Sequence, residues 1–153
     1  RTSIFDYCCI PTLVRWYNNG NCGIQKLNNK ERKIRAFYKK VLRLCNGEKA
    51  ISEGAFFDLM YVNYHNLNPN KQYLYLRHYE NETLLIAVNF DSQDATVYAD
   101  IPQHAFDFLK IDSGTYFMKE LISGKQKTVE FSSNAKFELH IPAHNGVVWK
   151  IVK

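Results

Sequence analysis

The chain has 153 residues, of which 46% are hydrophobic and 14% aromatic, and its formal net charge is +5. This length and composition support one ordinary domain, or one domain with an appendage, and exclude a disordered tail. No apolar run approaches the roughly 20 residues that a membrane-spanning helix needs, so the sequence predicts no membrane partner.

Much of the positive charge falls in one predicted helix, which carries Lys30, Arg32, Lys33, Arg35, Lys39, Lys40 and Arg43. Aromatic residues do not interleave with these side chains in the pattern that stacks nucleic-acid bases. We therefore interpret the basic residues as a solvated helix face and expect no nucleic-acid partner. The alternative is a basic module that binds nucleic acid through this helix. Its affinity for nucleic acid would then fall steeply as the salt concentration rises.

Four cysteines occur, at Cys8, Cys9, Cys22 and Cys45. They form no C-x-x-C pair, and none falls in the predicted strands, so we expect free thiols. Free thiols favour a reducing compartment such as the cytoplasm, and the periplasm stays open as the alternative. The five histidines are scattered without metal-ligand spacing, so we expect no metal and no cofactor.

The first 27 residues are expected to be irregular, apart from a short helical turn that begins at Pro11, because proline suits a first helical position. Since the chain begins with Arg1 rather than Met, we expect it to be excised from a longer polypeptide.

A strong amphipathic helix is predicted over residues 28–46. Asn28 and Glu31 have the spacing of a capping box, Glu31 and Arg35 that of a favourable (i, i+4) pair, and Gly47 is the expected stop. The apolar residues recur at helical spacing and form one stripe, made of Ile34, Phe37, Tyr38, Val41, Leu42 and Cys45.

From Gly54 onward the apolar period changes to two, which predicts strands. Residues 55–62 are apolar on both faces of the predicted strand. In residues 72–79 successive side chains point to opposite faces, and one face carries Tyr73, Tyr75 and Tyr79. Further strands are expected at 83–90, 95–101, 116–122, 127–131, 137–141 and 147–152, while 104–111 is ambiguous. Short strands with frequent turns predict a mainly β chain, an antiparallel β-sandwich with Greek-key-like connections, preceded by the helix and the irregular N-terminal segment.

Six segments carry a resemblance to a known family: RTSIFDY at 1–7, WY at 16–17, RAFYKKVL at 35–42, GAFFDL at 54–59, LIAVNF at 85–90 and IPAHNGVV at 141–148. Taken in order, they resemble the C-terminal part of α-amylase-family glycoside hydrolases (family 13). In that family a (β/α)8 barrel ends in its eighth helix and passes into an all-β domain, called domain C. The resemblance covers essentially the whole chain and implies that residues 1–47 are the barrel tail and residues 48–153 are domain C.

The family's catalytic motifs are absent from this sequence. They are an Asp in Gly-x-Arg-x-Asp, a Glu acid/base and an Asp within Asn-His-Asp, and the resemblance implies that all three lie upstream of Arg1. We therefore expect no catalytic residue here and predict that the fragment alone is inactive. Its implied role is to pack on and stabilise the missing catalytic barrel of an enzyme that acts on α-glucans.

Aromatic residues supply the candidates for carbohydrate contact. The resemblance places Phe5, Tyr7, Trp16 and Tyr17 in a βα loop on the barrel's catalytic face, where a ring could flank a glucan. Tyr73 and Tyr75 could stack on sugar rings. In each case structural packing is the alternative. The alternative function for the chain is an autonomous carbohydrate-binding β-sandwich that uses Tyr73 and Tyr75.

The expected contacts with the barrel are the Ile34, Phe37 and Val41 stripe and the apolar segment 56–62. Without the barrel, we expect the stripe to fold onto the β-domain or to drive self-association, because exposed apolar patches of this size are rare on monomers.

Overall fold

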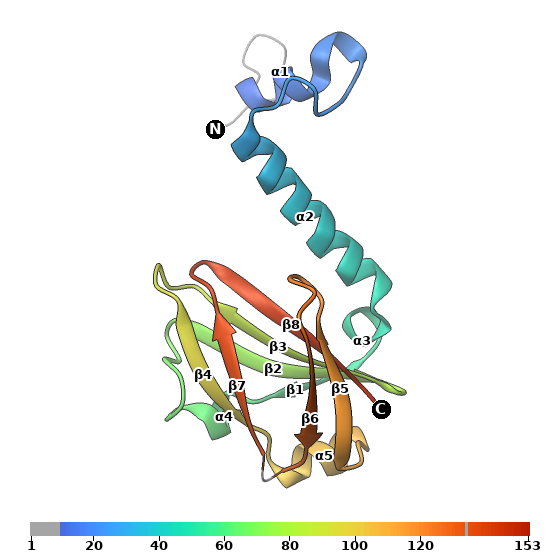
Figure 1. Cartoon of the computed structure of the whole chain (residues 1–153), viewed down its shortest axis with the longest axis vertical. Coiled ribbons are helices and arrows are strands. Elements are labelled where there is room, and N and C mark those ends of the chain that lie inside the picture. The colour runs from blue at the N-terminus through green and yellow to red at the C-terminus, as the bar shows by residue number, and fades with distance from the viewer. Residues whose placement is uncertain (1–9, 134) are drawn as a thin grey trace. The chain divides into compact units, whose positions relative to one another are not determined.

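Figure 1 shows the computed structural model, which describes residues 10–133 and 135–153. The chain forms two compact units, of which the first ends at Arg43 and the second runs from Leu44 to Lys153. The predictions for Phe5, Tyr7, Cys8 and Cys9 lie outside the described residues.

The elements follow in chain order: α1 (Pro11–Tyr17), η2 (Asn18–Gly20), α2 (Asn29–Gly47), α3 (Lys49–Ser52), β1 (Ala55–Asp58), α4 (Met60–Asn63), β2 (Gln72–Tyr79), β3 (Glu82–Asn89), β4 (Ala95–Asp100), α5 (Gln103–Leu109), β5 (Gly114–Glu120), β6 (Gln126–Phe131), β7 (Lys136–Ile141) and β8 (Asn145–Val152).

Helix α2 begins as the sequence predicts. The Asn28 N–H donates to Glu31 Oε2 and the Glu31 N–H donates to Asn28 Oδ1, both over 2.9 Å, which confirms the capping box. The expected stop at Gly47 is wrong by one residue, because α2 includes Gly47 and the extended backbone of Glu48 (φ −95°, ψ 110°) follows it. Among the described residues no helix, α2 included, is long and apolar enough to cross a membrane.

The predicted pair between Glu31 and Arg35 is wrong, because Glu31 turns toward α1 instead. The Thr12 hydroxyl donates to Glu31 Oε1 over 2.7 Å, and Arg15 Nε donates to Glu31 Oε2 over 3.2 Å. The Arg15 Nη2 also forms an ion pair with Glu31. One carboxylate therefore caps α2 and ties α1 to its first turn.

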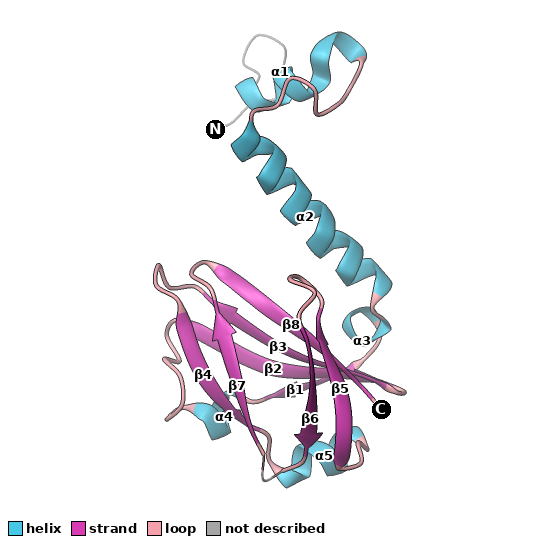
Figure 2. Ribbon diagram, viewed as in Figure 1, coloured by secondary structure: helices cyan, strands magenta, loops and turns pink. Residues whose placement is uncertain are grey.

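The second unit is an antiparallel β-sandwich, as predicted. Its larger sheet has the order β1-β2-β3-β8-β5-β6, and its smaller sheet pairs β4 with β7 (Figure 2). The main core lies between the two sheets and takes Leu74 and Leu85 from the larger sheet and Leu139 from the smaller one. Strand β7 alternates as predicted, with Phe137, Leu139 and Ile141 buried and the residues between them exposed.

The predicted two-sided strand at residues 55–62 is wrong. Strand β1 ends at Asp58, whose Oδ1 accepts the Met60 N–H over 2.9 Å, and the backbone then turns into α4. Leu59 and Met60 are both buried in the main core. The dense apolar run therefore comes from a short strand followed by a helical turn.

Replacing Glu31 tests the corner between α1 and α2. The hydrogen bond from Arg15, with those from Thr12 and the Asn28 N–H, lowers the pKa of Glu31 from 4.5 to about 2. A carboxylate whose pKa is lower when folded stabilises above its unfolded pKa, and the contribution is lost as the pH falls from about 4.5 to about 2. The helical circular dichroism signal should therefore fall over this range in the wild type.

Glu31→Gln removes the titrating group but keeps an oxygen that can accept the Asn28 N–H. We expect this variant to start with less helical signal and to change less between the two pH values. Glu130→Gln, at an exposed position of β6, is the control and should titrate like the wild type. Identical pH profiles for the wild type and Glu31→Gln would show that Glu31 does not cause the loss of helical signal, which would contradict this prediction.

Candidate functional site

The outer face of the larger sheet, which is turned away from the smaller sheet, carries the tyrosines predicted from the sequence. Tyr73 and Tyr75 follow each other on this face of β2, with ring centroids 5.6 Å apart, while Leu74 between them points into the main core. Phe56 of β1 adds a third ring, 5.4 Å from Tyr75. The fold therefore brings Tyr73 and Tyr75 together.

Among the described residues of the second unit, α3 covers only part of this outer face. Ala50 of α3 packs on Leu84 and Ile86 to form a small second core. Beyond α3, Phe56 and Tyr73 are exposed, 45% and 37% respectively. They border an open hollow of about 460 Å³ lined by Ile51, Phe56, Tyr73, Tyr75, Arg77, Ile86 and Val88. The lining is mostly apolar, so it suits an apolar partner.

Charged side chains fix α3 at one end of this face. Arg77 Nε donates to the Ala50 carbonyl over 2.9 Å, and Glu82 Oε1 accepts the Ala50 N–H over 3.0 Å. Lys150 donates to Glu48 over 2.6 Å and to Glu82 over 3.1 Å. Burial would lower the pKa of Lys150, but the two carboxylates outweigh it and raise the pKa. The short helix is therefore held in place, and the rest of the face stays open.

The other two predicted contact residues belong to the first unit. Trp16 lines an apolar hollow of about 470 Å³, together with Thr12, Leu13, Leu27, Glu31, Ile34 and Arg35. Tyr17 is exposed beside it and does not line this hollow. Trp16 and Tyr17 thus belong to one unit, and Tyr73 and Tyr75 belong to the other.

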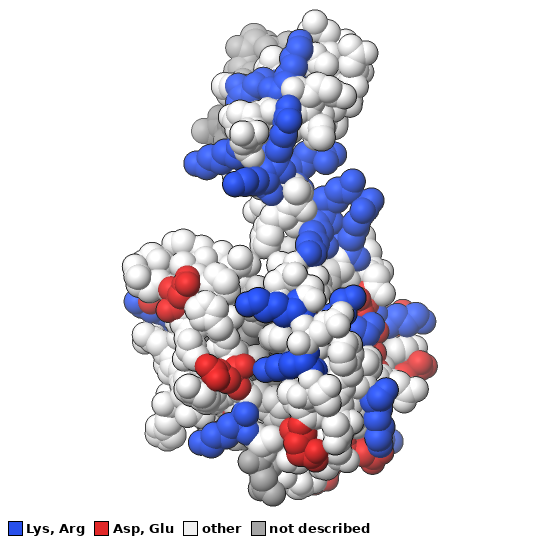
Figure 3. Space-filling view, in the orientation of Figure 1, with Lys and Arg blue, Asp and Glu red and all other residues white. Residues whose placement is uncertain are grey.

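The apolar stripe of α2 is largely exposed among the described residues. None of the 19 residues of this helix is buried. Ile34, Phe37 and Leu42 of the stripe are 50%, 40% and 60% exposed. Lys and Arg side chains gather along the helix in Figure 3, with no acidic side chain among them on the face that is drawn.

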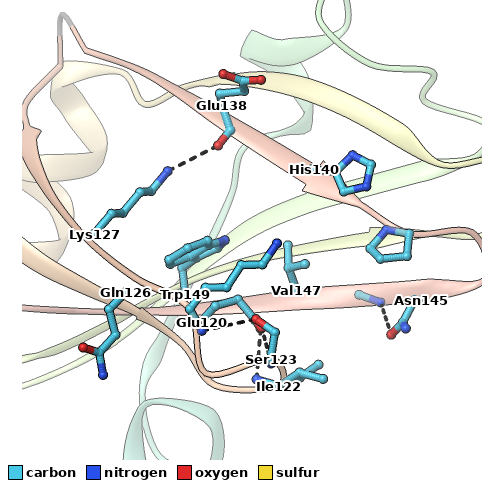
Figure 4. Close-up of a pocket in the computed structure, with 13 residues that line it drawn as sticks. Glu120, Ile122, Ser123, Gln126, Lys127, Glu138, His140, Asn145, Val147 and Trp149 are labelled. Atoms are coloured by element: carbon cyan, nitrogen blue, oxygen red, sulfur yellow. Dashed lines mark hydrogen bonds between the residues drawn. The ribbon is translucent and has the colours of Figure 1, made fainter.

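A third hollow, of about 570 Å³, opens between β6 and β7 over β8 (Figure 4). The Lys127 ammonium lies 4.8 Å from the centre of the Trp149 ring and donates to the Glu138 carbonyl over 3.4 Å. Partial burial lowers the pKa of Lys127. Lys127 thus covers the face of the Trp149 ring on which a ligand would stack. We interpret this contact as a structural one that closes the edge of the sandwich.

The carboxylates beside this hollow do not form a glycosidase pair. Glu120 is buried and accepts the N–H groups of Ile122 and Val148, each over 3.0 Å, and that of Ser123. Burial would raise the pKa of Glu120, but these hydrogen bonds outweigh it and lower the pKa, whereas a catalytic acid needs a raised one. Figure 4 shows the Glu138 carboxylate turned away from Glu120.

The described part of the chain holds no cluster of three or more His, Cys, Asp or Glu side chains that could bind a metal ion. Cys22 and Cys45 are free thiols, as expected.

Sequence reasoning missed one exposed aromatic group, which lies on the other side of β1. It consists of Phe57, Tyr61, His104 and Phe108. The signal in the sequence is the spacing of His104 and Phe108, which are four residues apart and so share one face of a helix. The group was missed because the apolar residues in 104–111 do not recur at a clear helical or strand spacing.

Comparison with solved structures identifies the fold. An α-amylase from Geobacillus thermoleovorans, solved with acarbose, matches 88% of this chain with a TM-score of 0.60 and 16% identity. The fold is one that α-amylases contain. An Anoxybacillus α-amylase matches 78% of the chain with a TM-score of 0.55 and 18% identity. The resemblance seen in the sequence is thus confirmed as a likeness of fold.

The structural match covers only a part of each α-amylase, and it is not limited to α-amylases. The chain spans only 24% and 22% of the lengths of these two α-amylases. The α-galactosidase I of Mortierella vinacea also matches 81% of this chain, with a TM-score of 0.53 and 17% identity, so the fold reaches beyond α-amylases. No protein-family model matches the sequence, and no curated protein matches it.

Replacing Glu120 tests the buried carboxylate. In Glu120→Gln an amide NH₂ would meet backbone N–H groups, and a buried donor left without its acceptor costs about 1–3 kcal/mol. The free energy of unfolding should fall by this amount in urea. Trp149 fluorescence can report it if Trp16→Phe is the background, since the chain has 2 tryptophans. Glu138→Gln, at an exposed position of β7, is the control. Equal stability of the two variants would contradict the role of Glu120.

Proposed function

We propose that this chain is the C-terminal part of an α-amylase-type glycoside hydrolase that acts on α-glucans. In this proposal residues 1–47 are the tail of the (β/α)8 barrel and residues 48–153 are the all-β C-terminal domain. The chain's own role is to pack on the catalytic barrel and to stabilise it. The observation that carries the proposal is the uncovered apolar surface of α2.

Helix α2 needs a partner for physical reasons. Most helical stability in proteins comes from packing an apolar face rather than from the intrinsic propensity of the helix. The apolar stripe of α2 includes Ile34, Phe37 and Leu42, yet no residue of the helix is buried. Covering side chains that are now about half exposed would contribute roughly 1–2 kcal/mol each. A catalytic barrel that α2 closes would supply this cover.

The outer face of the larger sheet supports the same role. The hollow bordered by Phe56 and Tyr73 continues the small core under α3, and its lining is mostly apolar. Its one guanidinium, that of Arg77, is already bonded to the carbonyls of Ala50 and Ile51. The surface therefore offers apolar area and aromatic rings without a free charge to neutralise, as a packing interface requires.

The alternative function, an autonomous carbohydrate-binding β-sandwich, would use Tyr73 and Tyr75. The exposure of Tyr73 favours it, because a flat ring open to solvent can stack on a sugar. Tyr75 weakens it, because that ring is half-buried between Phe56 and Tyr73. We therefore assign this pair to domain packing.

The packing role can be tested on α2 with two matched serine variants. Phe37 lies in the apolar stripe and Lys39, two residues on, lies on the opposite, polar face. Phe37→Ser and Lys39→Ser therefore place the same residue in the same helix but differ in the contact they remove. In the longer enzyme, Phe37→Ser should lower the free energy of unfolding by about 3 kcal/mol. Lys39→Ser should change it by less than about 0.5 kcal/mol.

In the 153-residue chain alone, Phe37→Ser should have almost no effect, because the side chain is already 40% exposed. Urea unfolding of both forms measures the difference. Equal effects of the two substitutions in the longer enzyme would show that nothing packs on the stripe, and the proposal would fail.

A further inference from the structure

Four aromatic rings gather at one surface of the β-domain, where β1, α4 and α5 meet. Phe57 lies at the centre, with its ring centroid 6.5 Å from Tyr61, 5.1 Å from His104 and 5.9 Å from Phe108. The Tyr61 and His104 rings are 5.7 Å apart. We call these four residues the aromatic platform.

The fold holds the platform rigidly. Asp58 ends β1 and accepts the Met60 N–H, which starts the helical turn that presents Tyr61. Helix α5 is anchored by its buried face of Ala105, Phe106 and Leu109. His104 and Phe108 stand one turn apart on the opposite side of that helix. The rings are therefore positioned before any ligand arrives, which lowers the entropy cost of binding.

The platform is open to solvent, although it is apolar in character. Tyr61 is 48% exposed and Phe108 61% exposed, while Phe57 is half-buried beneath them. The ring faces that Lys side chains cover in the described chain are those of Tyr79, Tyr116 and Trp149, and the platform is not among them. Large exposed aromatic groups on a domain surface mark interaction sites.

Polar groups border these rings. Tyr61 Oη lies 2.6 Å from His104 Nε2, so the two side chains fix each other's orientation. On α5, Gln103 Nε2 donates to Asp107 Oδ1 over 3.0 Å. Hydroxyl, imidazole, amide and carboxylate groups can donate to or accept from the hydroxyl groups of a sugar. The acids of this region, Asp58 and Asp107, make it unsuited to a polyanion.

We propose that the aromatic platform is a binding site for a neutral oligosaccharide. The apolar face of one sugar unit stacks on Phe108 and another on Tyr61, while the Tyr61 hydroxyl and His104 hold sugar hydroxyls. The Phe57 ring between them is tilted by 56° to the Tyr61 ring and by 49° to the Phe108 ring. That the sugar is an α-glucan rests on the proposed function, whereas the site itself does not.

Sugar binding here would not compete with domain packing. Side chains alternate along a strand, so Phe56 and Phe57 point to opposite sides of β1. Phe56 contacts Tyr75 on the outer face, and Phe57 contacts α4 and α5 on the other side. A catalytic domain on the outer face would therefore leave the platform free to hold a glucan chain.

The test is calorimetric titration of the 153-residue chain with maltoheptaose. We expect saturable binding, weakened about tenfold in Phe108→Ala by the loss of a stacked ring. Tyr61→Phe keeps the ring and removes only the hydroxyl, so it should weaken binding less. Phe117→Ala, at a 40% exposed ring of β5, is the control and should bind like the wild type. Because Phe108 is largely exposed, thermal unfolding should be unchanged in its variant.

Three results would overturn the inference. Absence of saturable binding would remove the platform as a sugar site and leave the proposed packing role standing. Binding that is lost in Tyr73→Ala but kept in Phe108→Ala would assign the sugar to the outer face and favour the alternative function. Self-association that depends on Phe108, without sugar binding, would also contradict the inference and would identify the platform as a protein contact.

Discussion

The larger sheet is apolar on both faces, and the rest of the structure depends on this constraint. In β3, Leu85 and Ala87 point into the main core, while Leu84 and Ile86 between them point to the outer face and are also buried. A sheet of this kind needs cover on two sides. The smaller sheet and α5 supply it on one side, and the short helix α3 supplies only part of it on the other.

The charged groups around α3 show that this partial cover is specific. Arg77 and Glu82 bond to the backbone of Ala50, and Lys150 bonds to Glu48, the residue before this helix of 4 residues. These contacts fix the place of α3 on the sheet. The surface beyond α3 is also apolar, and no other described element of the second unit covers it. This surface and an amphipathic helix that buries none of its residues are the basis of our proposal that the chain packs on a further domain.

Much of the fold could be predicted because its signals are local. The capping box of Asn28 and Glu31, the alternation in β7 and the turn-rich spacing of the strands each lie within a few residues. The ion pair of Glu31 with Arg15 could not be predicted, because the partners are 16 residues apart and meet only after the chain turns. The end of β1 at Asp58 was missed because a strand and a helical turn that face the same core have the same apolar composition.

Candidate surface residues were harder to predict than elements. Tyr73 and Tyr75 share a face through simple alternation, but the sequence does not tell which face of a two-sided sheet stays open. Phe57 meets Phe108 across 51 positions, and only the packing of α5 on β1 brings them together.

Hydrogen exchange along α2 tests the central claim most directly, because it reports whether this helix is stable without a partner. In the 153-residue chain, the amides of α2 should exchange far faster than those of β3 and β8. In the longer enzyme they should be protected to a similar degree as the central strands. Strong protection of α2 in a monomer of the chain alone, or none in the longer enzyme, would contradict the account.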